Sequence, residues 1–291
     1  MLLELCVGDA AGAGFEYCPP EFVSKNNNLC YVKHPRHTEI AEGSYTDDGQ
    51  MSIGVAELML SDVDWTPLNI ANKFVEVFKR DERTGYSRLF YQLLKEVQTG
   101  EELLSKIKPV SEKSGASMRA PVIGFEPNWA DVTEKTRIQA QVTHNTYNGI
   151  KAAQATALMA HYFIYKKGKK EDLPRFLSNH VPAGESPCKW EEAYEGPVGA
   201  LGWMSVRAAI TAIMKNDSLS SILKASIAYT GDVDTVAAIA LGCASHCDEI
   251  KQDLPQSLID GLENKAYGRD YIIDLDKRLC EKYGVRTAAK V

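Results

Sequence analysis

The chain has 291 residues, and its 39 acidic and 33 Lys or Arg side chains give a formal net charge of −6. Hydrophobic residues make up 44% and charged residues 25% of the chain, as in an ordinary globular protein. These values exclude low-complexity, collagen-like and disordered classes. The acidic balance also argues against a long nucleic-acid track, because phosphate backbones are bound through clustered Lys and Arg.

Seven cysteines lie at irregular spacing without a CxxC pair, so we expect neither a disulfide framework nor a structural zinc site. Cys243 and Cys247 share a helix face beside His246, but two small buried thiols are the simpler interpretation. The first residues lack a basic region and meet two acids almost at once, unlike a signal peptide. The longest apolar stretch, 150–165, is too short to span a bilayer. We therefore expect no membrane segment and a cytoplasmic location.

Apolar residues recur at helical spacing along most of the chain. In the segment 68–80, for example, Ile70, Phe74 and Val77 fall on one stripe. Alternating strand patterns are nearly absent, so we predict an all-α protein. The predicted helices are Ser52–Ser61, Leu68–Arg80, Tyr86–Val97, Glu101–Ile107, Lys135–Val142, Tyr147–Lys166, Val198–Lys215, Ser218–Tyr229, Val233–Ser245 and Asp270–Tyr283.

Three stretches, 18–45, 115–131 and 181–197, have no convincing helical period. The first is long, rich in Pro and Asn, and of the kind that usually serves as a lid or binding loop. We expect His34 and His37 within it to be solvated.

The glycine-rich segment 8–16 suggests a phosphate-binding turn. No strand precedes it and no GKS/T follows, however, so neither a Rossmann nor a Walker fingerprint fits. Close packing between helices explains these glycines equally well.

Thr46, Asp47 and Asp48 stand at the start of a predicted helix. One acid there would serve as a cap and would match the helix dipole. Two adjacent carboxylates and a hydroxyl exceed what a cap needs, and they are hard oxygen donors suited to Mg²⁺, Mn²⁺ or Ca²⁺.

A second acidic helix start holds Asp232, Asp234 and Thr235. The apolar run that follows predicts a buried helix, and carboxylates at its end would need partners or a cation. The four aspartates of the two segments would balance the charge of two divalent cations in one shared site. Because about 185 residues separate the two segments, sharing a site favours a single domain.

A further loop, 114–121, is built of small residues that permit close backbone approach, and its amide or hydroxyl donors could hold an anionic group. Taken alone, it is an ordinary loop.

Taken in order, these segments resemble the ADP-ribosylglycohydrolases, which include the dinitrogenase reductase-activating glycohydrolase type. The segment with two aspartates, a threonine and a run of alanines is the most specific of them. The matching blocks are Gly8-Asp9, Gly12 and Glu16; Thr46-Asp47-Asp48; Gly115-Ala116-Ser117-Met118-Arg119; Thr143-His144-Asn145; and Gly231-Asp232-Val233-Asp234-Thr235-Val236-Ala237-Ala238-Ile239.

The resemblance implies a compact all-α single domain over residues 1–291 with a centre of two Mg²⁺ (or Mn²⁺) ions, in which Asp234 bridges the ions. The implied metal ligands are Thr46, Asp47, Asp48, Asp232, Asp234 and Thr235. The implied catalytic carboxylates are Asp47, Asp48 and Glu16. The implied substrate-binding residues are Gly115, Ser117, Met118, Arg119 and His144.

The implied activity is metal-dependent hydrolysis that removes ADP-ribose from modified protein side chains, in arginine or serine linkage, by cleavage at C1″ of the distal ribose. The expected partner is an ADP-ribosylated protein or ADP-ribose conjugate, and the expected state is a monomer. The alternatives are a non-catalytic ADP-ribose-binding or structural relative and another two-metal hydrolase. Gly49, Ser114 and Thr230 depart from the family's usual residues, which leaves the substrate subclass open.

Overall fold

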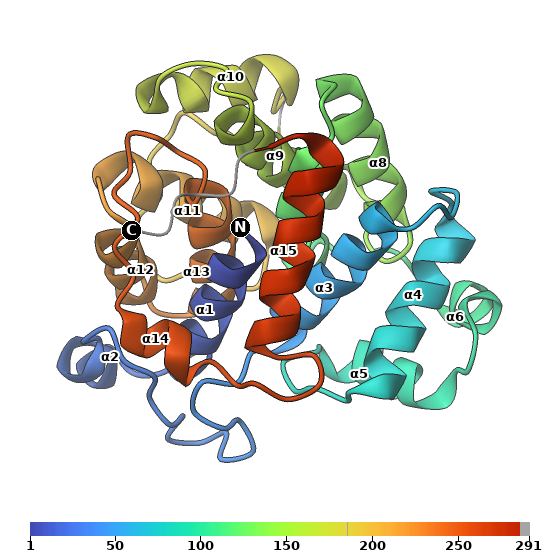
Figure 1. Ribbon diagram of the computed structural model, residues 1–291, viewed down its shortest axis with the longest axis horizontal. Helices are drawn as coiled ribbons and strands as arrows, with labels where there is room; N and C mark the ends of the chain where they lie inside the picture. Colours follow the sequence, from blue (N-terminus) through green and yellow to red (C-terminus); the bar gives the residue numbers. More distant parts are fainter. Residues whose placement is uncertain (185, 286–291) are drawn as a thin grey trace.

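The computed structural model describes residues 1–184 and 186–285 (Figure 1). Within that part the regular elements are helices, joined by loops and isolated β-bridges, so the prediction of an all-α protein is confirmed. The helices are α1 (Leu2–Ala13), α2 (Pro20–Asn26), α3 (Asp47–Leu60), α4 (Pro67–Arg80), α5 (Arg88–Glu96), α6 (Gly100–Lys106), α7 (Gly115–Met118), η1 (Pro121–Phe125), α8 (Trp129–Gln141), α9 (Tyr147–Ile164), η2 (Lys170–Asp172), α10 (Leu173–His180), α11 (Gly202–Lys215), α12 (Leu219–Ala228), α13 (Val233–Ala244), α14 (Gln256–Gly261) and α15 (Arg269–Tyr283). No helix in this part of the chain combines the length and apolar character needed to cross a bilayer.

The centre of the fold is the pair α1 and α13, which lie side by side (Figure 1). Every residue of α13 is buried, and in α1 only Glu4 is not fully buried. Helices α3, α9, α11, α12 and α15 pack around this pair. Such all-round burial accounts for the weak amphipathic pattern of the two central helices.

Two glycines of α1 allow the close approach of the central pair. A Cβ atom on Gly12 would lie 2.3 Å from the Cα atom of Asp234, and one on Gly8 would lie 2.5 Å from the carbonyl oxygen of Ala237. Both neighbours are backbone atoms of α13, so neither can move independently of its helix. Of the two interpretations of the glycine-rich segment, a phosphate-binding turn and close helix packing, the structure supports helix packing.

Helix α1 was absent from the predicted elements, because its residues are apolar or small on every face and give no helical stripe. The short helices α2, α7, α10 and α14 and the 3₁₀ helices η1 and η2 were also missed. Helices α7 and η1 lie within the stretch 115–131, so the expectation of a loop there is wrong. Helices α2 and α10 carry a proline at the start of the helix, where its missing N–H costs no hydrogen bond.

Helix α11 begins at Gly202 rather than at the predicted Val198. Val198 forms a parallel bridge with Gly231: its amide donates to Thr230 O at 2.9 Å, and its carbonyl accepts from the amide of Asp232 at 3.0 Å. Long-range pairing with the loop before α13 therefore replaces the first turn of the predicted helix.

The substitution Gly12→Ala should push α1 and α13 apart, because its new methyl group meets backbone that cannot yield. We expect the free energy of unfolding to fall by about 1–3 kcal/mol, as for other overpacked interiors. Urea denaturation followed by circular dichroism measures the change.

Gly54→Ala is the matched control, because Gly54 is also helical and its added Cβ would meet the side chain of Val77 at 3.2 Å instead of backbone. Its loss of stability should be much smaller, since alanine also favours the helix. Equal losses in the two variants would contradict the close-packing explanation.

Candidate active site

A cleft of about 840 Å³ lies where the loops before α3, α5, α7 and α13 meet. Its acidic end is formed by Glu16, Asp47, Asp48, Asp232 and Asp234. Its lining also includes basic, aromatic and aliphatic side chains, among them Tyr86, Arg88, Leu89, Phe90, Lys106, Lys108, Val110 and Lys113. Gly115, Met118, Arg119, Thr143 and His144 line the cleft as well.

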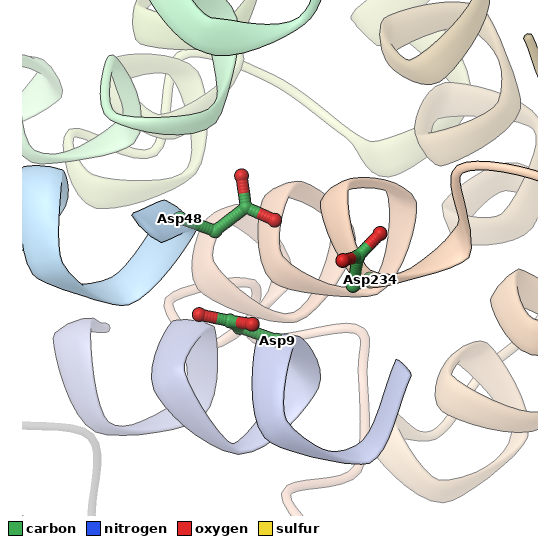
Figure 2. A group of neighbouring side chains, drawn as sticks. All are labelled: Asp9, Asp48 and Asp234. Atoms are coloured by element: carbon green, nitrogen blue, oxygen red, sulfur yellow. The ribbon is translucent and has the colours of Figure 1, made fainter. Parts of the chain in front are cut away.

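Three helices supply the carboxylates at the base of the acidic end. Asp9 comes from α1, Asp48 from the first turn of α3 and Asp234 from the first turn of α13, and their side chains face one another in Figure 2. One oxygen from each lies within 4.8 Å of the others. All three residues are buried. This arrangement can hold a cation.

A second group of carboxylates shares one member with the first. Glu16, Asp232 and Asp234 likewise offer oxygens within 4.8 Å of one another. Asp234 thus belongs to both groups, and the hydroxyl of Thr235 lies 3.2 Å from an Asp48 oxygen between the two helix starts. The structure therefore brings together residues from both acidic segments named from the sequence.

Asp9 holds the start of α3 in place. Its carboxylate accepts from the backbone amide of Thr46 at 2.8 Å, from the Thr46 hydroxyl at 2.8 Å and from the amide of Gly49 at 2.7 Å. These bonds satisfy free N–H groups of the first turn, as a capping side chain does. The sequence assigned no role to Asp9, although it lies within the glycine-rich segment 8–16. Thr46 does not line the cleft, and its hydroxyl is bound to Asp9.

Asp47 is held by the loop before α5. Its amide donates to Thr84 O at 3.1 Å, and the next residue, Gly85, has a φ of +100°. A Cβ on Gly85 would lie 2.1 Å from the Asp47 carboxylate. Gly85 also lines the cleft. Sequence reasoning gave Gly85 no role, since a lone glycine between two predicted helices is typical of an ordinary turn.

The loops bearing Glu16 and Asp232 are joined to each other. The amide of Tyr17 donates to Gly231 O at 2.8 Å, and both Tyr17 and Gly231 have positive φ angles, of 49° and 87°. Gly231 tolerates this conformation because it lacks a side chain. A Cβ there would also meet the carbonyl oxygen of Val198 at 1.9 Å.

His34 is buried beneath the Glu16 loop, so the expectation that it is solvated is wrong. Its Nε2 lies 2.8 Å from Glu16 O, and its Nδ1 accepts from the amides of Arg36 and His37. His37, which was also expected to be solvated, is exposed. No described residue between 18 and 45 lines the cleft, so this stretch supports the site from behind instead of covering it.

Burial and mutual repulsion make the carboxylates of the acidic end hard to ionise. Burial, followed by the charges of neighbouring carboxylates, raises the pKa values of Asp47, Asp48 and Asp234 well above the ordinary range. The same causes, burial first, raise the pKa of Glu16 to about 7, and burial raises that of Asp9 to about 6. A bound cation would offset both effects.

The residues named for substrate binding separate into two groups. Gly115, Met118, Arg119 and His144 line the cleft, whereas Ser117 lies behind its wall, fully buried and with a hydroxyl that has no partner. Arg119 is also almost fully buried, and its guanidinium donates to Gln139 and Thr143.

The chain matches the sequence model of the ADP-ribosylglycohydrolase family over residues 1–289. It belongs to the ADP-ribosylglycohydrolase family. The resemblance inferred from the sequence blocks, and the enzyme family that it implied, are thereby confirmed.

Individual relatives of this glycohydrolase-family chain are distant. ADP-ribosylhydrolase ARH3 of Xenopus tropicalis is 26% identical over 65% of this chain and 56% of that protein, so the match spans little more than half of the relative. ADP-ribosylarginine hydrolase Tri1 of Pseudomonas putida is 23% identical over 82% of this chain and 67% of that protein. ADP-ribosylhydrolase ARH3 of Homo sapiens is 22% identical over 86% of this chain and 75% of that protein.

A solved structure described as an ADP-ribosylglycohydrolase-related protein complex has the same fold. Its TM-score is 0.70 at 20% identity, and the match covers 97% of this chain and 96% of that one. This likeness confirms the helical architecture predicted for the family member.

Gly85→Ala should weaken metal binding by about tenfold or more, because the new methyl group would displace the Asp47 carboxylate. Mg²⁺ titration by isothermal calorimetry measures the effect. Gly196→Ala is the control: Gly196 has a similar φ of +83° but no atom within 4 Å of its added Cβ, so it carries the backbone strain without the clash. Equal Mg²⁺ affinities in the two variants would contradict this role.

The stability of the metal-free protein should fall as pH rises. Glu16 and Asp9 have pKa values raised to about 7 and about 6, so the folded state keeps protons that the unfolded chain releases near pH ~4. Their stabilisation is complete below that pH and is lost as pH rises through 6 to 7. We expect the Tm in EDTA to be higher at pH 5 than at pH 8, and Mg²⁺ to raise the Tm more at pH 8.

Scanning fluorimetry across this pH range, with EDTA or with Mg²⁺, measures the effect. Glu16→Gln should flatten the EDTA profile, since it removes the group titrating near neutrality. A Tm that rises from pH 5 to pH 8 in EDTA would show that the carboxylates are compensated without a cation.

Proposed function

We propose that this chain is a metal-dependent hydrolase that releases ADP-ribose from modified protein side chains by cleaving the bond at C1″ of the distal ribose. The observation that carries the proposal is the pair of carboxylate groups that share Asp234 at the acidic end of the cleft. Membership of the glycohydrolase family supports the reaction class. We further propose that residues 1–291 act as one domain and as a monomer.

The donor set fits two Mg²⁺ or Mn²⁺ ions. All candidate ligands supply oxygens, which these hard cations prefer. The structure groups Asp48 and Asp234 with Asp9, and Asp232 and Asp234 with Glu16. Asp47 lies outside both groups, and the hydroxyls of Thr46 and Thr235 contact Asp9 and Asp48. Asp48, Asp232 and Asp234 are buried, and the carboxylates repel one another, so dications would balance their negative charge. When bound, such ions would polarise the hydroxyls of the distal ribose and orient the sugar.

The rest of the cleft suits the remainder of ADP-ribose. Arg88, Lys108 and Lys113 are exposed on its walls and have no ion pair within the described part of the chain, so their charges are available to a diphosphate. Leu89 and Val110 are 74% and 72% exposed and offer apolar contacts for a base or an acceptor side chain. The lining of the cleft therefore offers carboxylates for cations and ribose, and basic and apolar side chains for phosphates and an apolar group.

The carboxylates at the acidic end carry the proton transfer. As the bond between C1″ and the acceptor breaks, water forms the new bond to C1″ and gives its proton to a carboxylate, and the acceptor leaves with a proton supplied by that carboxylate or by solvent. Glu16, Asp47 and Asp48 are the candidates for this base.

The substrate class that we propose is protein-linked ADP-ribose in arginine or serine linkage. The relative in Pseudomonas putida is named an ADP-ribosylarginine hydrolase, and the vertebrate relatives are named ADP-ribosylhydrolases. A panel of peptides carrying ADP-ribose on arginine or on serine, assayed with Mg²⁺ present, identifies the linkage by the product released.

Two alternatives are tested by the same assay. A non-catalytic relative would bind ADP-ribose, seen as a rise in Tm, without releasing product from any peptide. A different two-metal hydrolase of the helical phosphohydrolase kind would release phosphate instead. The carboxylate clusters found among the described residues contain no histidine, which disfavours the His-rich metal shells of that class.

Asp234→Asn should lower the rate of ADP-ribose release by on the order of a hundredfold or more, because it weakens the carboxylate that belongs to both groups. Asp248→Asn removes the same charge from a side chain that is 79% exposed and outside the cleft, and it should leave the rate unchanged. Release is measured by chromatography of free ADP-ribose. Near-normal turnover in Asp234→Asn would refute the mechanism.

A further inference from the structure

A chain of hydrogen bonds runs from Arg119 through Thr143 to His144 in the wall of the cleft. The Nη2 atom of Arg119 donates to Thr143 Oγ1 at 2.8 Å, and that hydroxyl lies 2.6 Å from His144 Nδ1. Arg119 is fixed in turn by Gln139, whose Oε1 accepts from its Nε at 2.6 Å, and by the ring of Phe74, which lies 4.4 Å from the guanidinium carbon. Every link is buried, so solvent does not compete for these bonds.

The directions of these hydrogen bonds follow from which side-chain atoms can donate and which can accept. Arginine only donates, so Thr143 Oγ1 accepts from Arg119 and its own hydrogen needs an acceptor. The only acceptor within reach among the described partners of this hydroxyl is His144 Nδ1. The opposite tautomer would place a proton on Nδ1 and leave the Thr143 hydrogen buried without a partner, at a cost of about 1–3 kcal/mol. The imidazole proton therefore resides on Nε2.

Electrostatics agree with a neutral imidazole that carries one proton. Burial, and then the charge of Arg119, lower the pKa of His144 to about 3. Burial lowers the pKa of Arg119 to about 9, which still leaves it protonated and donating at neutral pH. Arg119 thus acts as a donor to Thr143 and as a charge that disfavours a second proton on the ring.

His144 carries an unpartnered Nε2–H beside the cleft. His144 lines the cleft, is only 6% exposed, and its Nε2 is a buried polar atom with no partner in the described protein. The contact of its Nδ1 with the Thr143 hydroxyl fixes the ring, which packs beside Gly115, where an added Cβ would lie 3.1 Å from Cε1. A buried donor of this kind is costly unless a ligand supplies an acceptor.

We propose that Thr143 and Arg119 are positioning residues that hold His144 in the Nε2–H tautomer, so that it donates a hydrogen bond to a ribose or phosphate oxygen of ADP-ribose. The inference rests on the proposed function for the identity of the ligand, but the tautomer itself follows from the protein alone. Arg119 then contributes to binding through Thr143 and His144, without its own bond to the ligand.

Thr143→Val tests the proposal, because valine keeps the shape of threonine and removes the hydroxyl. The ¹⁵N shifts of the His144 ring should show a protonated Nε2 and an unprotonated Nδ1 in the wild type, and a mixture of tautomers in Thr143→Val. The Kd for ADP-ribose, measured by calorimetry with Mg²⁺, should rise about five- to tenfold. Thr143→Ser restores the hydroxyl and should restore both readouts.

Thr136→Val is the matched control. Thr136 lies in α8, which ends just before Thr143, and is fully buried, but its hydroxyl has no partner, so the same substitution removes no hydrogen bond there. It should leave the His144 shifts and the Kd unchanged. This comparison separates the loss of the hydrogen bond between Thr143 and His144 from the general effect of deleting a buried hydroxyl. If Thr143→Val does not fold, the Thr143→Ser variant remains informative.

A wild-type spectrum with the proton on Nδ1 would overturn the proposal that Arg119 and Thr143 hold His144 in the Nε2–H tautomer. An unchanged Kd in a folded Thr143→Val variant would also overturn it. Failure of the wild type to bind ADP-ribose would overturn the proposed function. That failure is distinguishable, because the ring shifts of the unliganded protein report the tautomer independently.

Discussion

The close contact between α1 and α13 is the constraint on which the acidic end of the cleft depends. Gly8 and Gly12 bring the two backbones into contact, and this contact sets Asp9 beside Asp234. Asp9 then holds the first turn of α3 through three hydrogen bonds, which delivers Asp48 to the same place. The packing of α1 against α13 therefore positions carboxylates from the three helices α1, α3 and α13. A larger residue in α1 would disturb the site as well as the core.

The same burial that stabilises the fold makes its acidic end electrostatically unfavourable. Carboxylates crowded in a low-dielectric interior repel one another, and only protons or cations relieve the repulsion. Such a site is kept at a cost in stability, as at many functional sites, and the well-packed apolar core offsets that cost. Binding of cations would return part of that free energy to the folded state, because the unfolded chain cannot assemble the ligands.

Much of this architecture could be predicted from the sequence, because the helices carry regular apolar stripes and the acidic helix starts carry an unusual density of oxygen donors. The omissions have physical causes. Helix α1 has no polar face, so periodicity could not reveal it, and Asp9 was overlooked among glycines whose role is packing. Gly85 matters through a contact with Asp47, which is distant in the chain. His34 looked solvated in a polar loop, yet the tertiary fold buries it beneath Glu16.

The order in which the chain is made has a consequence for the group formed by Asp9, Asp48 and Asp234. Its members come from near the start, the first quarter and the last quarter of the sequence, and none of them makes a site with its sequence neighbours alone. During synthesis the N-terminal acids must therefore wait until α13 has left the ribosome. Contacts between such distant segments form late in folding. Cation capture would thus mark the completion of the fold, and a truncated product would lack this means of stabilisation.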